Sequence, residues 1–485
     1  MANPVAELVF IPIPGVGHIM STIEMAKVLI NHDERLSITV LLINPPYSAF
    51  ALTTYIKSLA NKVMEMERIR FIQLPQDKTP PNFDGKAPMT SFNDYINSYT
   101  KNVRNVVADI ISRPDSNPVV GFVLDIFCIS MIDVADEFNI PSYVFFTSNA
   151  AFLGFKVYIE TLLVQNQDVI ALSNSNGEMV IPTFMKPVPT NVFPGVYQIQ
   201  EGLDFLMHSV RKLKQVKAIM VNTFMELETH AVKSLSSDST LPPVYPVGPI
   251  LNLDGVAGKT DKSDVINWLD GQPTSSVVFL CFGSMGCFTE VQVKEIAYAL
   301  EKSNHRFIWS LRQPPQSEKS FEVLPGDYDD PAVVLPEGFL ERTAETGKVI
   351  GWAPQVSLLG HEAVGGFVTH CGWNSVLESL WFGVPTATWP MYAEQQMNGF
   401  EMVVELGLAA EIKLEYKNNV FNPEDDMVIV TAEEIERGIR RVMEDKDLRG
   451  KVKEMSKKSR ETVIEGGSSY NSVNSMVQEF ISNIT

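Results

Sequence analysis

The segment GFVTHCGWNSVLESLWFGVP, residues 366–385, carries the most informative local pattern in this 485-residue chain. Its first four residues are typical of a buried strand, and a glycine-containing turn follows them. A helical pattern then begins at Ser375 and continues to Phe382, where Gly383 and Pro385 are typical of residues just beyond a helix C-terminus. The segment therefore predicts a strand, a tight turn and a helix N-terminus in direct succession.

A helix N-terminus that follows a strand in this way is suited to binding an anion. The first N–H groups of a helix have no partner within it, and the helix dipole is positive at this end. His370 adds a donor at the turn. Glu378, one turn inside the helix, is placed to accept hydrogen bonds from a diol such as ribose.

Further groups suited to a nucleotide stand on either side of this helix. Trp352 offers a flat face for a base, Gln355 offers an amide for the base edge, and Glu394 and Gln395 follow a later strand end. Each residue alone has a structural explanation, because a single tryptophan is more often part of a core and a single glutamate is more often solvated. Their concentration at strand ends within residues 352–395 favours a nucleotide site.

Short apolar strands alternate with helical patterns on both sides of this segment. In the first half the predicted strands are residues 8–13, 37–43, 119–124 and 142–146, with helical stretches at 21–30 and 129–137. In the second half the predicted strands are residues 277–282, 306–311, 348–350, 366–369 and 386–389, with a helix at 291–301. This alternation is typical of α/β proteins with parallel, doubly wound sheets, so we expect two Rossmann-like domains that face each other across a cleft.

The predicted domain boundary lies in a stretch rich in Pro, Gly and Asp, residues 241–262. We place the N-terminal domain at residues 1–245, the linker at 246–262 and the C-terminal domain at 263–460. The last residues, 461–485, are expected to form a helix that packs back on the N-terminal domain.

Charge and cysteine content narrow the class of protein further. With 39 Lys and Arg against 58 Asp and Glu, the formal net charge of −19 argues against nucleic acid or an anionic membrane as the main partner. The cysteines have neither zinc-site nor disulfide spacing, which indicates reduced thiols in a cytosolic protein. Neither a signal peptide nor an apolar run of about 18 residues occurs, so we expect a cytoplasmic monomer with no membrane span.

Two polar residues follow predicted strands of the first half and are candidates for proton transfer. His18 comes after the first strand and near a helix start, where the helix dipole disfavours the imidazolium and keeps the ring neutral. Asp125 ends the strand at 119–124, so both side chains are expected at the same edge of a parallel sheet. A carboxylate behind a histidine fixes its tautomer and stabilises the cation that forms on proton uptake. A structural histidine and a strand-end turn residue are the alternative interpretations.

Residues 352–395 resemble, over their full length, the plant secondary product glycosyltransferase box of the family 1 UDP-dependent glycosyltransferases. The chain is similar to that family elsewhere, in the strand before His18, in the sequence VYPVGPI and in the turn CFGSMG. The resemblance implies the GT-B fold, with a UDP-sugar donor held mainly by the C-terminal domain and a small acceptor by the N-terminal domain. It also implies transfer of the sugar with inversion.

By position, the resemblance assigns the candidate site residues. The nucleoside is expected to contact Trp352, Ala353, Gln355 and Glu378. The diphosphate is expected to contact Ser284, His370, Asn374 and Ser375. The transferred sugar is expected to contact Thr147, Trp373, Glu394 and Gln395. The same resemblance makes His18 the catalytic base and Asp125 its partner.

Gln395 bears on the choice of sugar. A final Gln rather than His in the box is the family pattern associated with glucose instead of galactose. An amide both donates and accepts, so it can bridge neighbouring hydroxyls of an equatorial sugar. We therefore expect UDP-glucose as the donor. We expect no metal or other cofactor, because Ser284, His370 and the helix N-terminus can stabilise the departing diphosphate.

The acceptor is the least determined partner. Its pocket is expected to be formed by residues 89–95, Phe127, 150–155 and 191–200, which are rich in Phe and other apolar residues and suit a flat lipophilic molecule. A phenolic such as a flavonoid is the leading hypothesis, and terpenoid or hormone acceptors are the alternatives.

Three other classes of protein share parts of these patterns. The sequence PGVGH at residues 14–18 suggests a nicotinamide oxidoreductase, but Met20 stands where the dinucleotide fingerprint needs a small residue. Ser284 suggests a hydrolase, but Phe282 occupies the glycine position of a nucleophile elbow. A nucleotide-sugar epimerase or a binding protein of the same fold stays open, and analysis of the reaction products would exclude an epimerase.

Overall fold

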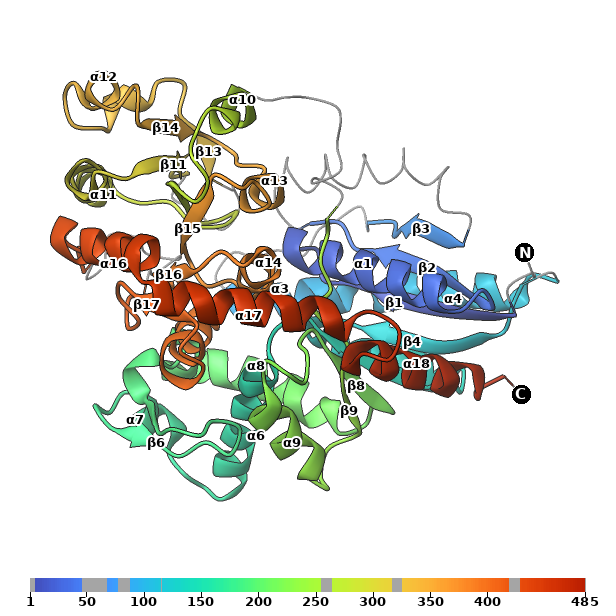
Figure 1. The fold of residues 1–485 in the computed structure, drawn as a ribbon. Helices are drawn as coiled ribbons and strands as arrows, with labels where there is room; N and C mark the ends of the chain where they lie inside the picture. Colours follow the sequence, from blue (N-terminus) through green and yellow to red (C-terminus); the bar gives the residue numbers. More distant parts are fainter. Residues whose placement is uncertain are drawn as a thin grey trace.

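The computed structural model describes residues 5–45, 68–76, 88–114, 116–253, 264–315, 325–417 and 428–484. Over these ranges the chain forms two α/β halves, each built around a parallel sheet (Figure 1). The two halves meet at the edges where their strands end, and this meeting place holds the candidate site described below.

The first sheet has seven strands in the order β3-β2-β1-β4-β5-β8-β9, and every neighbouring pair is parallel. Its strands are β1 (Ala6–Ile11), β2 (Leu36–Leu42), β3 (Ile69–Gln73), β4 (Val119–Leu124), β5 (Ser142–Phe146), β8 (Ala218–Val221) and β9 (Val244–Pro246). β1 is buried on both faces, because Val9 and Ile11 pack into one core and Leu8 and Phe10 into the other. Strands covered on both faces are continuous apolar runs in the sequence.

Helices of the first half cover this sheet. They are α1 (Val16–His32), α3 (Pro88–Ser98), α4 (Thr100–Ser112), η2 (Ile126–Met131), α5 (Ile132–Glu137), α6 (Ala150–Val164), α7 (Val169–Ser173), η3 (Thr190–Val192), η4 (Gly195–Gln198), α8 (Gln200–Leu213) and α9 (Thr229–Ser237), with a short hairpin of β6 (Glu178–Met179) and β7 (Val188–Pro189). α6 begins after Asn149, whose side chain accepts a hydrogen bond from the Phe152 N–H at 2.6 Å. This cap fixes the start of α6 close to the end of β5.

The second sheet has six strands in the order β14-β11-β10-β15-β16-β17, again all parallel. Its strands are β10 (Val277–Cys281), β11 (Arg306–Ser310), β14 (Gly347–Ile350), β15 (Val364–Thr369), β16 (Thr386–Thr388) and β17 (Ala409–Glu411), and β12 (Arg312–Gln313) pairs with β13 (Gly326–Asp327) beside it. The helices of this half are α10 (Asp264–Asp270), α11 (Glu290–Ser303), η6 (Pro331–Val333), α12 (Phe339–Arg342), α13 (Gln355–Leu359), α14 (Trp373–Phe382), α15 (Gln395–Phe400), η7 (Glu401–Glu405), α16 (Ala432–Glu444) and α17 (Lys446–Thr462). None of the helices in the described ranges combines the length and the apolar character that a membrane span needs.

Each sheet reverses its strand order at one place. In the first sheet β1 lies between β2 and β4, and in the second sheet β10 lies between β11 and β15. At such a reversal the connections after two neighbouring strands turn to opposite sides, which leaves a crevice at the carboxyl ends of the strands where ligands bind. The reversals therefore lie at β1/β4 and at β10/β15.

The predicted elements agree with the observed ones, and the differences lie mainly at their ends. β4 and β5 have the predicted bounds. α1 begins at Val16 rather than near residue 21, and α14 begins at Trp373 rather than at Ser375. Val244–Pro246, which lies in the stretch interpreted as a linker, forms β9 at the edge of the first sheet. A three-residue edge strand is too short to leave a periodic pattern in the sequence.

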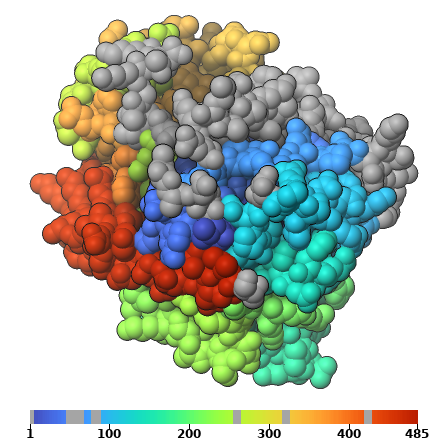
Figure 2. Space-filling model, turned by 90° about the vertical axis from the view of Figure 1, so that its right-hand side faces the viewer, coloured from blue at the N-terminus to red at the C-terminus, as the bar shows by residue number. Residues whose placement is uncertain are grey.

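The end of the chain crosses back from the second half to the first. α17 packs against α14, and α18 (Ser468–Ile481) packs against α1, β4 and β9. The ring of Phe480 meets the edge of Tyr143 of β5 with ring centroids 4.8 Å apart. Figure 2 shows the end of the chain, in red, lying directly against the N-terminal residues, in dark blue. The apolar face of α18 thus completes the core on one side of the first sheet.

Candidate active site

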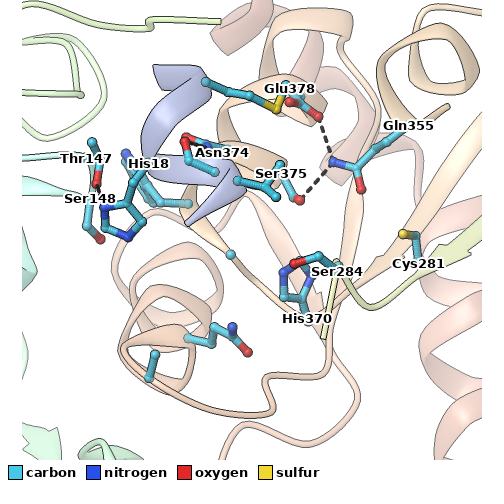
Figure 3. A pocket seen from close by; sticks show the side chains of 18 of the residues that line it. His18, Thr147, Ser148, Cys281, Ser284, Gln355, His370, Asn374, Ser375 and Glu378 are labelled. Carbon is cyan, nitrogen blue, oxygen red and sulfur yellow. Dashed lines mark hydrogen bonds between the residues drawn. The ribbon is translucent and has the colours of Figure 1, made fainter. Parts of the chain in front are cut away.

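A cavity of about 550 Å³ lies between the two strand-order reversals. Its lining comes from both halves and includes His18 and Thr147 of the first half and Ser284, His370 and Glu378 of the second. Figure 3 shows His18 and Thr147 on one side of this cavity, with Ser284 and His370 close together on another. This size is typical of pockets for small-molecule ligands.

His18 and Asp125 form a hydrogen-bonded pair at the reversal of the first sheet. His18 Nδ1 lies 2.6 Å from Asp125 Oδ2. The Asp125 side chain is 1% exposed, whereas that of His18 is 35% exposed. The other carboxylate oxygen of Asp125 accepts a hydrogen bond from the Phe127 N–H at 3.0 Å, where it caps η2. A carboxylate held in this way makes Nδ1 the protonated nitrogen of His18 and leaves Nε2 to accept a proton.

The pKa of His18 is raised above its ordinary value of 6.5. Burial favours the neutral ring, but Coulomb attraction and the hydrogen bond to the Asp125 carboxylate outweigh it, and Glu394 adds a smaller attraction. The sequence predicted two opposing influences on His18, a helix N-terminus that keeps the ring neutral and a carboxylate that stabilises its cation, and in the structure the carboxylate dominates. A full carboxylate at hydrogen-bond distance exceeds the partial charge of a helix end.

Thr147 contributes a third group to the first half of the site. It follows β5, and its Oγ1 lies 3.1 Å from His18 Nδ1, the nitrogen that also faces Asp125. The next residue, Ser148, donates a hydrogen bond to Glu394 of the second half at 3.2 Å. The end of β5 therefore touches both the candidate base and a residue expected at the sugar.

His370 stands at the reversal of the second sheet in a space that only glycines leave open. A Cβ atom on Gly283 would lie 2.5 Å from His370 Nε2, and a Cβ atom on Gly372 would lie 2.6 Å from the same atom. Gly283 also has a positive φ of 75°, which residues with a side chain rarely adopt. Glycine in the turn after β10 and in the turn after β15 therefore lets the imidazole lie against the backbone.

The electrostatic environment of His370 differs from that of His18. Burial lowers the pKa of His370 to about 4, so the ring is neutral near pH 7. Within the described part of the chain its Nδ1 has no hydrogen-bond partner, although it is buried. A buried polar nitrogen without a partner is uncommon in a native protein and marks a position where a ligand oxygen can be bound.

The N-terminus of α14 points its free N–H groups at the same place. Gly372 precedes the helix and provides no side-chain cap, and the Val376 N–H makes the first hydrogen bond of the helix, to the Gly372 carbonyl at 3.0 Å. The N–H groups of residues 373–375 therefore have no partner within the helix. Together with His370 and Ser284 they form a site suited to an anion.

Gln355, Ser375 and Glu378 form a hydrogen-bonded group beside this anion site (Figure 3). Gln355 Nε2 donates to Ser375 Oγ at 2.9 Å and to Glu378 Oε2 at 2.6 Å. Burial raises the pKa of Glu378 to about 7, and the hydrogen bond from Gln355 partly opposes that rise. Two residues predicted at the nucleoside, Gln355 and Glu378, are thus joined to Ser375, which was predicted at the diphosphate, and each of the three keeps hydrogen-bonding capacity for a ligand.

Trp352 lies at the mouth of the cavity with half of its surface exposed, as a stacking surface for a base requires. The Arg312 guanidinium lies over its ring, 5.0 Å from the centroid. Sequence analysis missed Arg312, which also lines the cavity beside Ala353. Its position depends on the β12–β13 pairing, and no local pattern in the sequence indicates that pairing.

Trp373 and Asn374 use their side chains to join the two halves. The indole N–H of Trp373 donates to the Asn222 carbonyl at 2.7 Å. Asn374 Nδ2 donates to the Gly17 carbonyl at 3.2 Å, and its Oδ1 accepts from the Ser21 hydroxyl at 3.1 Å. Both residues line the cavity as expected, but they offer a ligand chiefly their backbone N–H groups.

Gln395 is more constrained than its residue type suggests. Its Oε1 accepts hydrogen bonds from the backbone N–H groups of Met391 at 3.0 Å and Tyr392 at 3.1 Å. The expectation that this amide both donates to and accepts from a sugar was therefore wrong, since only Nε2 is left to donate. Glu394, the preceding residue, also lines the cavity and carries a carboxylate, which only accepts hydrogen bonds.

The apolar end of the cavity is lined by Phe127, Phe146, Phe152 and Lys156. Phe127 and the 150–155 stretch were expected here, and Phe127 and Phe152 lie where they were placed. Residues 89–95 and 191–200 contribute no residue to the described lining. Sequence analysis missed Phe146 and Lys156, although a single lysine in the apolar run AAFLGFKVYI was a visible signal.

No group of three or more His, Cys, Asp or Glu side chains suited to a metal ion occurs among the described residues. All four cysteines are free, and Cys281 lines the cavity near the turn that carries Ser284. Burial raises the pKa of the Cys281 thiol to about 11, so it is protonated near pH 7.

Comparison with known proteins gives a consistent result. Residues 240–459 match the family model described as UDP-glucoronosyl and UDP-glucosyl transferase. The chain is 50% identical to UDP-glucose flavonoid 3-O-glucosyltransferase 6 of Fragaria ananassa, with 96% of this chain and 97% of that protein covered.

Solved structures agree with the sequence relatives. A UGT transferase of Siraitia grosvenorii in complex with UDP has a TM-score of 0.85 at 45% identity, with 98% of this chain and 100% of that chain covered. A Medicago truncatula UGT complexed with UDP-glucose has a TM-score of 0.84 at 38% identity, with 99% and 98% covered. These findings set aside the oxidoreductase, hydrolase and epimerase hypotheses. The chain has the GT-B fold, and it belongs to family 1 of the plant UDP-dependent glycosyltransferases.

Proposed function

We propose that this enzyme transfers glucose from UDP-glucose to a hydroxyl group of a small lipophilic acceptor, with inversion at C1 of the sugar. The observation that carries the proposal is the position of the His18–Asp125 pair across one cavity from His370 and the N-terminus of α14. One side of the cavity is suited to accept a proton, and the other is suited to hold a diphosphate.

In the proposed reaction His18 acts as the general base. Its Nε2 takes the proton of the acceptor hydroxyl while the hydroxyl oxygen forms a bond to C1 of glucose. The bond between C1 and the diphosphate oxygen breaks, and its electron pair leaves with UDP. Asp125, 2.6 Å from His18 Nδ1, stabilises the imidazolium that results. The raised pKa of His18 supports this role, because it reports the same stabilisation of the cation.

The departing diphosphate meets groups of the second half. Ser284, His370 and the N–H groups at the start of α14 are placed to donate hydrogen bonds to it as its charge develops. These groups supply the stabilisation that a divalent cation supplies in other transferases, so the proposal includes no metal. The UDP and UDP-glucose held by the two solved relatives support the choice of donor.

An aromatic acceptor fits the apolar end of the cavity best. Phe127 stacks on Phe205 with ring centroids 5.9 Å apart, and Phe146 stacks on Phe152 at 6.4 Å. Flat rings of this kind favour a flat partner. The name of the Fragaria ananassa relative, a flavonoid 3-O-glucosyltransferase, supports a phenolic acceptor over a terpenoid or hormone.

The test is transfer from UDP-glucose to a panel of flavonoids, simple phenols, terpenoid alcohols and hormone-class alcohols, followed by mass spectrometry and by NMR of the anomeric proton. We expect β-glucosides, because UDP-glucose is α-linked and the transfer inverts C1. An α-glucoside would exclude the single-displacement mechanism, and UDP-galactose as the product would indicate an epimerase.

Donor choice is tested by competition between UDP-glucose and UDP-galactose. We expect a higher kcat/KM for UDP-glucose, because Gln395 Nε2 and Glu394 form a fixed donor and acceptor set against which an axial C4 hydroxyl would be misplaced. The variant Gln395→His should reduce the difference in kcat/KM between UDP-glucose and UDP-galactose. Equal use of both donors by the unaltered enzyme would overturn the preference for glucose and would leave the proposed transfer from a UDP-sugar intact.

A further inference from the structure

Lys156 is the one lysine of α6, in a stretch of the helix that is otherwise apolar. The surrounding sequence is AAFLGFKVYI, and the Lys156 side chain is 2% exposed. It nevertheless lines the cavity, on the same wall as Phe152. A lysine is rarely buried to this extent without an anionic partner, because removing an ammonium group from water is costly.

Among the residues that the structure describes, the Lys156 ammonium has no such partner. Over the described residues it makes neither a hydrogen bond nor an ion pair, and its contact is the face of Phe152, 5.6 Å from the ring centroid. The carboxylate on the same helix, Glu160, is already paired with Lys214 at 2.8 Å. A cation–π contact replaces only part of the hydration that a buried ammonium loses.

The charged form of Lys156 still dominates near neutral pH. Burial lowers the pKa of Lys156 to about 8, and attraction to Glu394, which also lines the cavity, opposes that fall. Glu394 itself accepts a hydrogen bond from Ser148. The cavity therefore contains, at its acceptor end, a cation that makes no direct ion pair with any described carboxylate.

We propose that Lys156 binds a carboxylate of the acceptor, so that the preferred substrates are aromatic acids that carry a hydroxyl at one end and a carboxylate at the other. The aromatic ring lies among Phe127, Phe146 and Phe152, the carboxylate contacts the Lys156 ammonium and the hydroxyl contacts His18. This assignment rests on the proposed function, which makes this end of the cavity the acceptor site. A carboxylate supplies the unit negative charge that a neutral flavonoid lacks.

The test compares para-hydroxycinnamic acid with its methyl ester, which keeps the ring and hydroxyl and removes the charge. Binding of each compound to the UDP-loaded enzyme is measured by isothermal titration calorimetry. We expect the acid to bind roughly 10- to 100-fold more tightly than the ester, as a charge-assisted contact in a buried site allows. In Lys156→Met, which keeps an unbranched side chain up to the Cε position and removes the charged nitrogen, this preference should disappear while affinity for the ester and for UDP stays the same.

Lys457→Met in α17 is the matched control, because this lysine is 78% exposed and lies outside the cavity. It should leave the preference for the acid intact, and thermal unfolding of both variants checks that each is folded. Equal binding of acid and ester by the unaltered enzyme, or an unchanged preference in Lys156→Met, would overturn the inference. Tight binding of the acid without transfer of glucose to either compound would instead refute the proposed function and leave the carboxylate site standing.

Discussion

The two strand-order reversals carry the same arrangement of elements and different side chains. His18 follows β1 and Asp125 follows β4 in the first half, while Ser284 follows β10 and His370 follows β15 in the second. β1 and β10 are equivalent strands, and so are β4 and β15, because each pair flanks the reversal in its own sheet. By position, His18 therefore corresponds to Ser284, and Asp125 corresponds to His370. The first reversal has a histidine paired with a carboxylate, whereas the second has a histidine without one.

That one difference gives the two histidines opposite properties. Asp125 raises the pKa of His18 and makes it a proton acceptor, whereas burial without a counter-charge lowers the pKa of His370 to about 4. A carboxylate next to His370 would repel a diphosphate at 3 to 4 Å by Coulomb forces. The comparison indicates that fold topology brings polar groups to a sheet edge, and that the presence of a carboxylate decides between proton transfer and anion binding.

The largest expected effect comes from removing the histidine of the first half. His18→Ala should lower kcat by about 10²- to 10⁴-fold on a weakly acidic alcohol, because it removes the general base. The Kd for UDP, measured by calorimetry, should stay within a factor of a few because the anion site lies in the other half. More than a tenth of the original rate would contradict the assigned role.

A smaller effect is expected at the second reversal. Gly283→Ala places a methyl group 2.5 Å from His370 Nε2 at a φ of 75°, so the imidazole must leave its position. UDP affinity should fall by roughly 10- to 100-fold. This loss combines the backbone strain of an alanine at positive φ with the loss of the His370 imidazole as a hydrogen-bond donor. The control is Gly450→Ala in α17, where a methyl group meets nothing within 4 Å. This control should bind UDP normally and be slightly more stable. Normal UDP affinity in Gly283→Ala would show that His370 is not needed for the diphosphate.

The next prediction concerns the pH dependence of kcat/KM, which reports the protonation state of His18. A raised pKa means that His18 is protonated, and inactive as a base, up to a pH above 6.5. We expect kcat/KM to fall by about tenfold per unit as the pH drops below that midpoint. Asp125→Asn removes the largest attraction that raises the pKa of His18, so burial is opposed only by the smaller attraction to Glu394 and the midpoint should move to lower pH. The measurement is the profile of kcat/KM against pH for the unaltered enzyme and for Asp125→Asn. An unchanged midpoint would show that Asp125 does not set the pKa of His18.

The smallest expected effect is none at all. Activity should survive prolonged treatment with EDTA, because the proposed stabilisation of the diphosphate comes from His370, Ser284 and the N-terminus of α14. The initial rate before and after chelation is compared, with magnesium or manganese added back. Loss on chelation with rescue by either ion would mean that the second reversal requires a cation, and the contrast drawn between the two histidines would need revision.

Much of the fold and of the candidate site could be predicted, because buried parallel strands are recognisable in the sequence as continuous apolar runs. β4 and β5 are continuous apolar runs with polar residues at their ends, so their bounds and Asp125 could be placed from the sequence. The pairing of His18 with Asp125 was also predicted from the strand ends, but the balance between burial, the carboxylate and the helix end depends on distances that the sequence does not give. Gln395 was misjudged because nearby backbone N–H groups occupy its oxygen. Arg312 reaches the cavity only through the β12–β13 pairing, which no local pattern indicates, whereas the single lysine in the apolar run around Lys156 was a signal that was overlooked.

The path of the chain between the halves has a mechanical consequence. The chain crosses once after β9 and again between α17 and α18, where Gly466 takes a left-handed conformation with φ of 86°. A single crossing would act as a swivel and leave each half free to rotate about it. Two separate crossings restrict the relative rotation of the halves more than one crossing would, because any rotation has to be accommodated at both connections. This restriction favours relative movements of the two halves that keep the sheet edge with His18 facing the sheet edge with His370.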